Sequence, residues 1–384
     1  MSWPAFWTDN RWQSKLLAPL AKLVCWEASR RLRNFQQHPP LRQTSACVIV
    51  VGNIVVGGSG KTPFIVWLAK QLQAEGLKVG IISRGYGGRY SHEKKRAHEG
   101  GATDEIDNGE NAQNRAILVS AQSDPQRVGD EPVLLAKQLG CLIAVSPKRA
   151  RAIELLNQHA TLDVIISDDG LQHYAMARDI EVVLIDAQRQ FGNQRCLPAG
   201  PLREPMGRLQ QVDFCIWNGL GVNEDFPSLS LTNASFAKVP FTTPTSHFKM
   251  DLTPLCFRQV MNSDKTLPVN AFEKQEVNAI AGIGHPQRFF ETLQTLQVVA
   301  HGREFADHYA YTVEDFADFD DAKPLLMTEK DAVKCSQMAQ AHQKSNWWYL
   351  EVAPLCEAET LTDDAGQPIR TELFTQILQR LHRT

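Results

Sequence analysis

Residues 48–62 hold the strongest structural signal in this chain. They read VIVVGNIVVGGSGKT, so a β-branched apolar run leads into a glycine-rich turn and then into an expected helix. In such a turn backbone N–H groups surround phosphate oxygens, a lysine reaches the outer phosphates and a threonine hydroxyl ligates magnesium. We therefore expect a nucleoside triphosphate to bind at Gly57, Gly58, Ser59, Gly60, Lys61 and Thr62.

This turn departs from the usual phosphate-loop pattern at one position. The strict form G-x-x-x-x-G-K-[ST] needs glycine at position 55, where this chain has Val55. The surroundings favour phosphate binding, because an apolar strand precedes the turn and Pro63 stands at the start of the expected helix. The alternative is an ordinary strand-to-helix turn without a ligand.

Apolar runs alternate with helical stretches from residue 46 to about residue 220. Their continuous hydrophobicity is typical of parallel strands covered on both faces, so the sequence predicts an α/β fold with a doubly wound parallel sheet of the P-loop NTPase type. Strands are expected at 47–52, 79–83, 116–120, 141–146, 164–168, 182–186 and 214–217. A second, smaller α/β unit is expected to contribute strands at 277–283 and 325–328 and helices at 285–296, 331–341 and 371–381.

The length of 384 residues exceeds what one core usually fills, so we expect more than one globular unit. The predicted divisions are an N-terminal segment at 1–35, a P-loop core at 36–223, a linker with short strands at 224–272 and a C-terminal α/β domain at 273–384. Within the core, residues 91–114 are polar and rich in glycine and acid, and they are predicted to form a flexible surface insertion.

Net charge and cysteine spacing exclude several classes of function. The formal charge of -3 gives no whole-chain attraction to nucleic acid, so none is expected as a partner, and no protein partner is evident. The 8 cysteines include no C-x-x-C pair, which argues against a zinc knuckle, an iron–sulfur cluster or a redox motif. Scattered thiols of this kind fit a reducing cytosol.

The first 35 residues combine several tryptophans with basic side chains. Apolar residues recur there at helical spacing, and Pro19 is expected at a helix start. No apolar run approaches the roughly 20 residues that span a bilayer, and the order of charges does not fit a signal peptide. We expect an amphipathic segment that lies on an anionic leaflet; the alternative is a helix packed on the protein's own core.

Acidic residues end the strand expected at 164–168. A carboxylate there can complete magnesium coordination together with Thr62 and the phosphates, which makes Asp168 and Asp169 candidate metal ligands. Adjacent strand residues point to opposite faces, so only one of the two is expected to bind, and the pattern does not choose between them. Taken alone, the same residues also fit a strand-ending Asp-Gly turn.

Four further positions carry side chains suited to phosphoryl transfer. Asp130 and Glu131 open a helix, where a carboxylate either caps the helix or orients an acceptor hydroxyl and takes its proton. Arg84 and Arg203 lie in glycine- and proline-containing loops and offer planar guanidinium groups to a phosphate or another anion. Each also has an ordinary structural interpretation.

Taken together, these motifs resemble the tetraacyldisaccharide 4'-kinase family, the lipid A 4'-kinases of Gram-negative bacteria. The resemblance covers nearly the whole chain, and the turn with Val55 is itself the family's form. The matching segments are 52–53 with 57–63, 83–88, 129–132, 168–173, 197–204, 282–286, 307–308 and 327–334.

The resemblance implies transfer of the γ-phosphate of ATP, with Mg²⁺, to the 4'-hydroxyl of a tetraacyldisaccharide 1-phosphate, giving lipid IVA at the cytoplasmic face of the inner membrane. It assigns Lys61 and Thr62 to phosphate and magnesium, and Asp130 with His308 to a catalytic pair that activates the sugar hydroxyl. It also implies that the N-terminal segment docks on the membrane that holds the lipid substrate. The rival interpretation is a membrane-associated nucleotide-switch ATPase or GTPase with a deviant phosphate loop.

Overall fold

The computed structural model describes residues 3–9, 11–85, 115–221, 224–227, 245–356 and 371–382. The predicted insertion at 91–114 lies outside these residues. The strands are β1 (Cys47–Gly52), β2 (Val79–Ser83), β3 (Ile117–Leu118), β4 (Leu142–Val145), β5 (Val164–Asp168), β6 (Ile180–Asp186), β7 (Phe214–Asn218), β8 (Ser246–Gln259), β9 (Thr266–Leu267), β10 (Glu276–Ala281), β11 (Val299–Glu304), β12 (Leu325–Thr328) and β13 (Trp347–Cys356). The helices are η1 (Ala5–Trp7), α1 (Trp12–Gln37), α2 (Lys61–Ala74), α3 (Pro125–Val128), α4 (Asp130–Gln138), α5 (Arg149–His159), η4 (Met206–Gln211), α6 (Pro286–Thr295), η5 (Val313–Phe316), α7 (Glu329–Ala341) and α8 (Glu372–Leu381).

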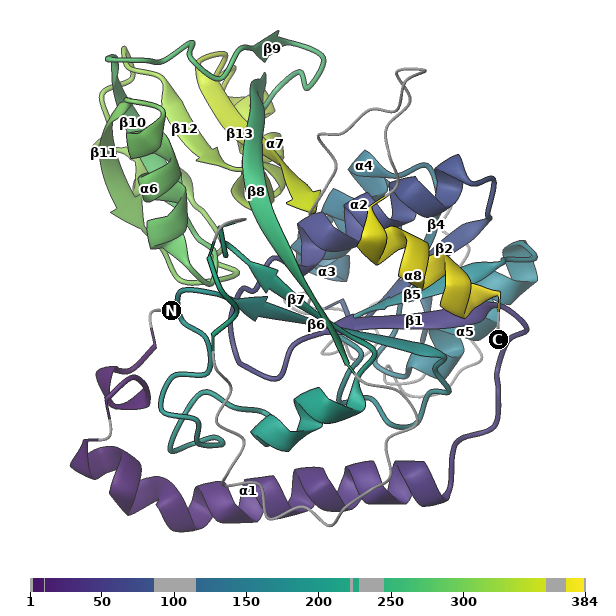
Figure 1. Ribbon diagram of the computed structural model, residues 1–384. Coiled ribbons are helices and arrows are strands. Elements are labelled where there is room, and N and C mark those ends of the chain that lie inside the picture. Colours follow the sequence, from purple (N-terminus) through teal and green to yellow (C-terminus); the bar gives the residue numbers. More distant parts are fainter. Residues whose placement is uncertain are drawn as a thin grey trace.

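All of these strands belong to one sheet, ordered β11-β10-β12-β13-β8-β7-β6-β1-β5-β2-β4-β3, with β9 added beside β8. In this order, neighbouring strands pair in parallel within two blocks. One block is β8-β7-β6-β1-β5-β2-β4, and the other is β11-β10-β12-β13. The two parallel blocks meet where β8 and β13 pair antiparallel (Figure 1). A mixed α/β fold with a large, mostly parallel sheet is therefore confirmed, whereas the proposed domain divisions stay predictions.

Helices cover both faces of this sheet. On the block that contains β1, helices α2, α4 and α8 pack on one face, and α1 and α5 pack on the other (Figure 1). On the block that contains β10, α6 and α7 pack on opposite faces. Strand β1 is buried along its whole length, which explains why its sequence is apolar without alternation.

The segment at 224–272 differs from its prediction. We expected a linker with short strands, but the structure has the 14-residue strand β8 there. Burial alternates along much of β8, and Pro254 pairs with Val352 beside a bulge. The sequence of β8 is therefore neither a continuous apolar run nor free of proline, and it does not indicate a long strand.

The N-terminal helix corrects two further expectations. Pro19 lies inside α1 rather than at its start, because Leu17 and Ala21 pack on the core and hold the helix together on both sides of the proline. Cys25 of α1 forms a disulfide with Cys196, with 6.0 Å between their Cα atoms, so the expectation that all cysteines are scattered thiols is wrong for this pair.

Within the described residues, no helix has the length and hydrophobicity needed to cross a bilayer.

Candidate active site

The phosphate loop leaves the carboxyl end of β1 and ends at the first turn of α2. Gly60 precedes this helix with φ of +87°, and a Cβ there would overlap the Asn218 amide, so the position requires glycine. The N-terminus of α2 therefore directs free backbone N–H groups toward the space where a phosphate would lie. The loop that the sequence predicted is present, with Lys61 and Thr62 opening the helix.

Three side chains fix the backbone of this loop. The Asn53 amide donates to the Gly57 carbonyl at 3.1 Å, and the Asn218 amide donates to the Ser59 carbonyl at 3.1 Å. Arg189 donates to the carbonyl oxygens of both Gly58 and Gly284. The loop is thus held in one conformation before any ligand binds, which lowers the entropy cost of binding.

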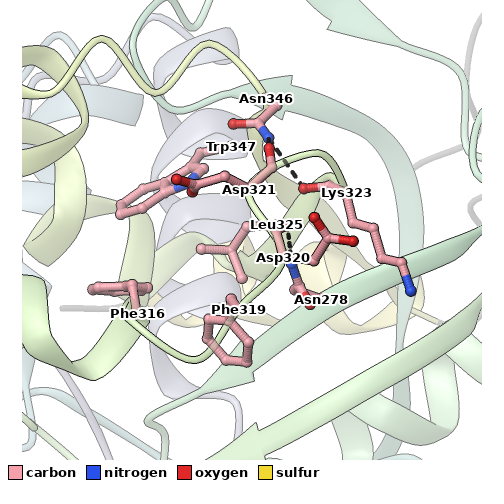
Figure 2. Close-up of a pocket in the computed structure, with 9 residues that line it drawn as sticks. All are labelled: Asn278, Phe316, Phe319, Asp320, Asp321, Lys323, Leu325, Asn346 and Trp347. Atoms are coloured by element: carbon pink, nitrogen blue, oxygen red, sulfur yellow. Dashed lines mark hydrogen bonds between the residues drawn. The ribbon is translucent and has the colours of Figure 1, made fainter.

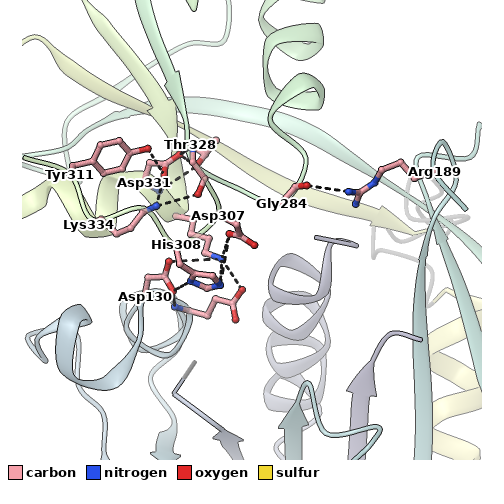
Figure 3. Close-up of polar contacts among 12 residues, drawn as sticks. Asp130, Arg189, Gly284, Asp307, His308, Tyr311, Thr328, Asp331 and Lys334 are labelled. Carbon is pink, nitrogen blue, oxygen red and sulfur yellow. Dashed lines mark hydrogen bonds and ion pairs between the residues drawn. The ribbon is translucent and has the colours of Figure 1, made fainter. Parts of the chain in front are cut away.

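Gly284 brings the C-terminal block of the sheet against the phosphate loop. It lies in the turn between β10 and α6, and a Cβ at this position would overlap the backbone nitrogen of Gly58. Figure 3 shows Arg189 reaching across to the Gly284 carbonyl, at 3.1 Å. Both blocks of the sheet therefore contribute to the nucleotide end of the site.

Asp168 lies at the carboxyl end of β5, next to β1 in the sheet. Its Oδ2 accepts a hydrogen bond from the Ser83 hydroxyl at 3.0 Å, while its buried Oδ1 has no partner within the described part of the chain. Burial, with a contribution from the Glu131 charge, raises the pKa of Asp168 to about 7. A buried carboxylate oxygen without a partner is the kind of group that a cation would stabilise.

Asp169 is already paired. Its carboxylate lies 3.6 Å from the Lys61 ammonium and accepts a hydrogen bond from Arg203 at 2.9 Å. Burial by itself raises the pKa of Asp169, but these two cations outweigh burial and hold the pKa below its usual range. The two adjacent aspartates therefore differ in role, because Asp168 offers an open oxygen and Asp169 orients two cations.

Asp130 and His308 meet although 178 residues separate them in sequence. His308 Nδ1 and Asp130 Oδ1 are 3.0 Å apart (Figure 3). Burial by itself raises the pKa of Asp130, but the His308 hydrogen bond and the Lys330 charge lower it to about 2. The other carboxylate oxygen of Asp130 is buried and has no hydrogen-bond partner among the residues described. It is therefore placed to accept a hydrogen bond from a substrate.

The remaining predicted residues have different surroundings. Glu131 is not open to a ligand in this structure, since its carboxylate forms a 3.0 Å ion pair with Lys330. Arg84 is exposed at the carboxyl end of β2, and the residues that follow from 86 to 114 lie outside the described part of the chain. Arg203 contacts Asp169 rather than an open pocket.

Sequence reasoning did not single out Lys330, Arg189, Asn53 or Asn218 as site residues. Asn53, Arg189 and Asn218 lie at or just beyond the carboxyl ends of β1, β6 and β7, and that shared position was the available signal. Lys330 was missed because the helix was expected to begin at Asp331, whereas α7 begins at Glu329 with Thr328 as its N-cap. The capping pattern of Thr328 with Asp331 three residues later was the available signal there.

A pocket away from these groups has a structural explanation. It lies between β12 and η5, and Asn278 and Asn346 are among the residues that line it (Figure 2). The Asn278 amide donates to the Asp320 carbonyl at 2.9 Å, and the Asn346 amide donates to the Lys323 carbonyl at 3.0 Å. Because both amides bind backbone carbonyls, they hold this corner together.

The family model described as tetraacyldisaccharide-1-P 4'-kinase matches residues 13–365 of the chain. The chain belongs to this family. A tetraacyldisaccharide 4'-kinase of Hydrogenovibrio crunogenus is 50% identical over 361 residues, which cover 93% of this chain and 95% of that protein. One of Photobacterium profundum is 41% identical over 353 residues, which cover 91% of this chain and 85% of that protein.

A solved structure of the same kinase family has a similar fold. It is the "apo" form of LpxK from Aquifex aeolicus in complex with ATP, which aligns with a TM-score of 0.67 and 25% identity over 96% of this chain and 99% of that one. The resemblance inferred from the motifs is thus confirmed, and with it the kinase activity in lipid A biosynthesis.

Proposed function

We propose that the residues around the phosphate loop and the Asp130–His308 pair carry out the tetraacyldisaccharide 4'-kinase reaction of this chain. ATP would lie with its phosphates at the N-terminus of α2, near Lys61 and Thr62. The acceptor would be the 4'-hydroxyl of a tetraacyldisaccharide 1-phosphate, and the product would be lipid IVA. The ATP complex of the Aquifex aeolicus LpxK supports ATP as the nucleotide.

In the transfer step the 4'-oxygen attacks the γ-phosphorus while the bond from that phosphorus to the β,γ-bridging oxygen breaks and ADP leaves. The hydroxyl proton moves to the Asp130–His308 pair, because a sugar hydroxyl is too weakly acidic to ionise beforehand. The buried Oδ2 of Asp130, which has no hydrogen-bond partner among the described residues, is the acceptor atom, and His308 holds the other oxygen of the carboxylate at 3.0 Å. Lys61 offsets negative charge on the outer phosphates.

Asp168 and Thr62 are the residues that would hold magnesium. The partnerless buried Oδ1 of Asp168 fits a hard cation, and Asp169 is already committed to Lys61 and Arg203. When bound, the ion would offset charge on the phosphate oxygens. Ser83 orients the Asp168 carboxylate through its other oxygen.

The observation that carries this proposal is the contact between Asp130 and His308, because it joins the two blocks of the sheet at a proton acceptor. Purified protein incubated with γ-labelled ATP and detergent-dispersed disaccharide 1-phosphate is expected to place label in the lipid fraction. Steady ATP hydrolysis that needs no lipid, with no label in the lipid, would instead support the nucleotide switch.

We also propose that α1 docks on the anionic leaflet at the cytoplasmic face of the inner membrane. One face of α1 packs on the core, and the opposite face carries a stripe of apolar residues that are each 54–69% exposed. Basic residues flank this stripe, which suits an anionic surface. The stripe consists of Trp12, Leu16, Leu20, Leu23 and Trp26.

Replacing all five stripe residues with serine is expected to lower binding to phosphatidylglycerol-containing vesicles by on the order of 10-fold or more, because apolar area buried in the interface is lost. Vesicle flotation measures this change. Deleting the whole segment is a poorer test, since Ser14 donates to the Ala199 carbonyl at 2.8 Å and Cys25 is bonded to Cys196.

The matched control replaces Asn34 and Gln37, exposed polar residues of the same helix, with serine. This control is expected to float with vesicles like the unmodified protein. Undiminished flotation of the five-residue variant would mean that the exposed stripe does not dock on the membrane.

A further inference from the structure

Lys330 is a largely buried cation in the first turn of α7. Its side chain is 15% exposed, and Thr328 caps this turn by accepting a hydrogen bond from the Asp331 backbone. A lysine near a helix N-terminus opposes the helix dipole, and burying an ammonium is costly unless carboxylates surround it. Its presence there calls for a reason other than the stability of the helix.

Three carboxylates from two other segments surround the Lys330 ammonium. It lies 3.0 Å from Glu131 Oε1, 3.1 Å from Asp307 Oδ1 and 3.8 Å from Asp130 Oδ2. Glu131 and Asp130 belong to α4, and Asp307 follows β11. Lys330 therefore joins the two blocks of the sheet at the same place as the Asp130–His308 contact.

The same ammonium lies 3.4 Å from Nε2 of His308. An ammonium can only donate hydrogen bonds, so Nε2 must be the acceptor and carry no proton in this contact. The ring proton is then on Nδ1, which faces Asp130 Oδ1 at 3.0 Å. The position of Lys330 thus selects the one neutral tautomer of His308 that donates to Asp130.

We propose that Lys330 is a positioning residue for proton transfer, which holds His308 in the Nδ1–H tautomer and keeps Asp130 ionised until the sugar hydroxyl gives up its proton. This inference rests on the proposed function of the Asp130–His308 pair. Lys330 itself need not touch the substrate, because it acts through these two side chains.

The first turn of α7 is itself fixed, which gives Lys330 a defined position. Asp331 is fully buried, and its carboxylate accepts hydrogen bonds from the Gly282 backbone at 3.0 Å and from the Tyr311 hydroxyl at 3.0 Å. Lys334 pairs with the same carboxylate at 2.7 Å. Figure 3 shows Tyr311, Asp331 and Lys334 gathered beside the His308 cluster.

The charged groups that face the pair decide how pH should affect it. Asp130 and Glu131 lie on α4, Asp307 and His308 follow β11, and Lys330 and Lys334 lie on α7. Burial lowers the pKa of His308, but the hydrogen bond and the charge of Asp130 together with the Asp307 charge outweigh burial, so the pKa is raised. The Lys330 charge lowers this pKa and limits the rise. Lys330 also lowers the pKa of Asp130. Removing this cation should therefore raise both pKa values.

The test is the pH profile of kcat for Lys330→Met, measured as label transferred to lipid. We expect kcat to fall by ~10-fold or more at neutral pH, with little change in KM for ATP, and the acid limb of the profile to move to higher pH. The shift has this sign because activity needs ionised Asp130 and neutral His308. Once the cation is gone both pKa values are higher, so both groups take up a proton sooner as the pH is lowered. Lys330→Arg, which keeps the charge, should keep the acid limb in place.

Lys344→Met serves as the matched control, since Lys344 forms an ion pair with Asp321 at the surface, outside the Lys330 cluster. Its profile should overlie that of the unmodified protein. If Lys330→Met fails to fold, the acid limb of Lys330→Gln is compared with that of Lys330→Arg. Glutamine can donate to Nε2 without a charge, so this comparison isolates the effect of the charge. An acid limb that stays in place in every folded neutral variant overturns the proposal. Absence of lipid labelling by the unmodified protein would instead count against the proposed function.

Discussion

Asp130→Asn is expected to lower kcat for lipid phosphorylation by roughly 10²-fold or more while leaving KM for ATP nearly unchanged. The asparagine amide has the shape of the carboxylate, but neither its oxygen nor its nitrogen is basic enough to take the proton of the sugar hydroxyl. Asp130 has no contact with the phosphate loop among the hydrogen bonds and ion pairs of the described residues, so nucleotide binding should persist. Transfer of label from γ-labelled ATP to lipid, at saturating and subsaturating ATP, separates the two effects.

His308→Ala belongs to the same experiment and should give a loss of similar size. Because the two residues act as a pair, the double variant should lose little more than either single one. Asp321→Asn is the control, since it changes a surface carboxylate that pairs only with Lys344 among the ion pairs of the described residues. Normal turnover in Asp130→Asn would remove that carboxylate from the mechanism.

Much of the central sheet could be predicted from the sequence. The bounds of β1, β2, β5 and β12 agree with the expected ranges, because each is a short apolar run buried on both faces. Strands β11 and β13 were not expected. Residues 299–304 are largely exposed at the edge of the sheet, so no apolar run marks them.

The site was predictable as a set of loops but not as a set of contacts. Asp168 and Lys61 follow strands of a parallel sheet, and the carboxyl ends of such strands meet at one edge. Local pattern does not tell which loop of the C-terminal block reaches this edge. The contacts of Lys330 with Glu131, and of Gly284 with Gly58, depend on how the antiparallel pair of β8 and β13 joins the two blocks.

Lys61→Met should reduce activity more than any of the other substitutions, with kcat/KM for ATP lowered by on the order of 10³-fold. Methionine keeps the length of the side chain and removes its charge, so the outer phosphates lose their nearest cation on α2. Asp169 would also lose one of its two partners, since the Lys61 ammonium lies 3.6 Å from its carboxylate. Kinetics over a range of ATP concentrations, with direct nucleotide binding by calorimetry, measure the loss.

Lys70→Met is the control for this substitution, because Lys70 lies exposed near the other end of the same helix. It should leave both kcat and KM unchanged. Lys61→Met and Asp130→Asn are expected to fail differently: the first should weaken ATP binding as well as turnover, and the second should affect turnover alone. If Lys61→Met bound and used ATP normally, the glycine turn after β1 would be an ordinary strand-to-helix connection, and the nucleotide would have to bind elsewhere.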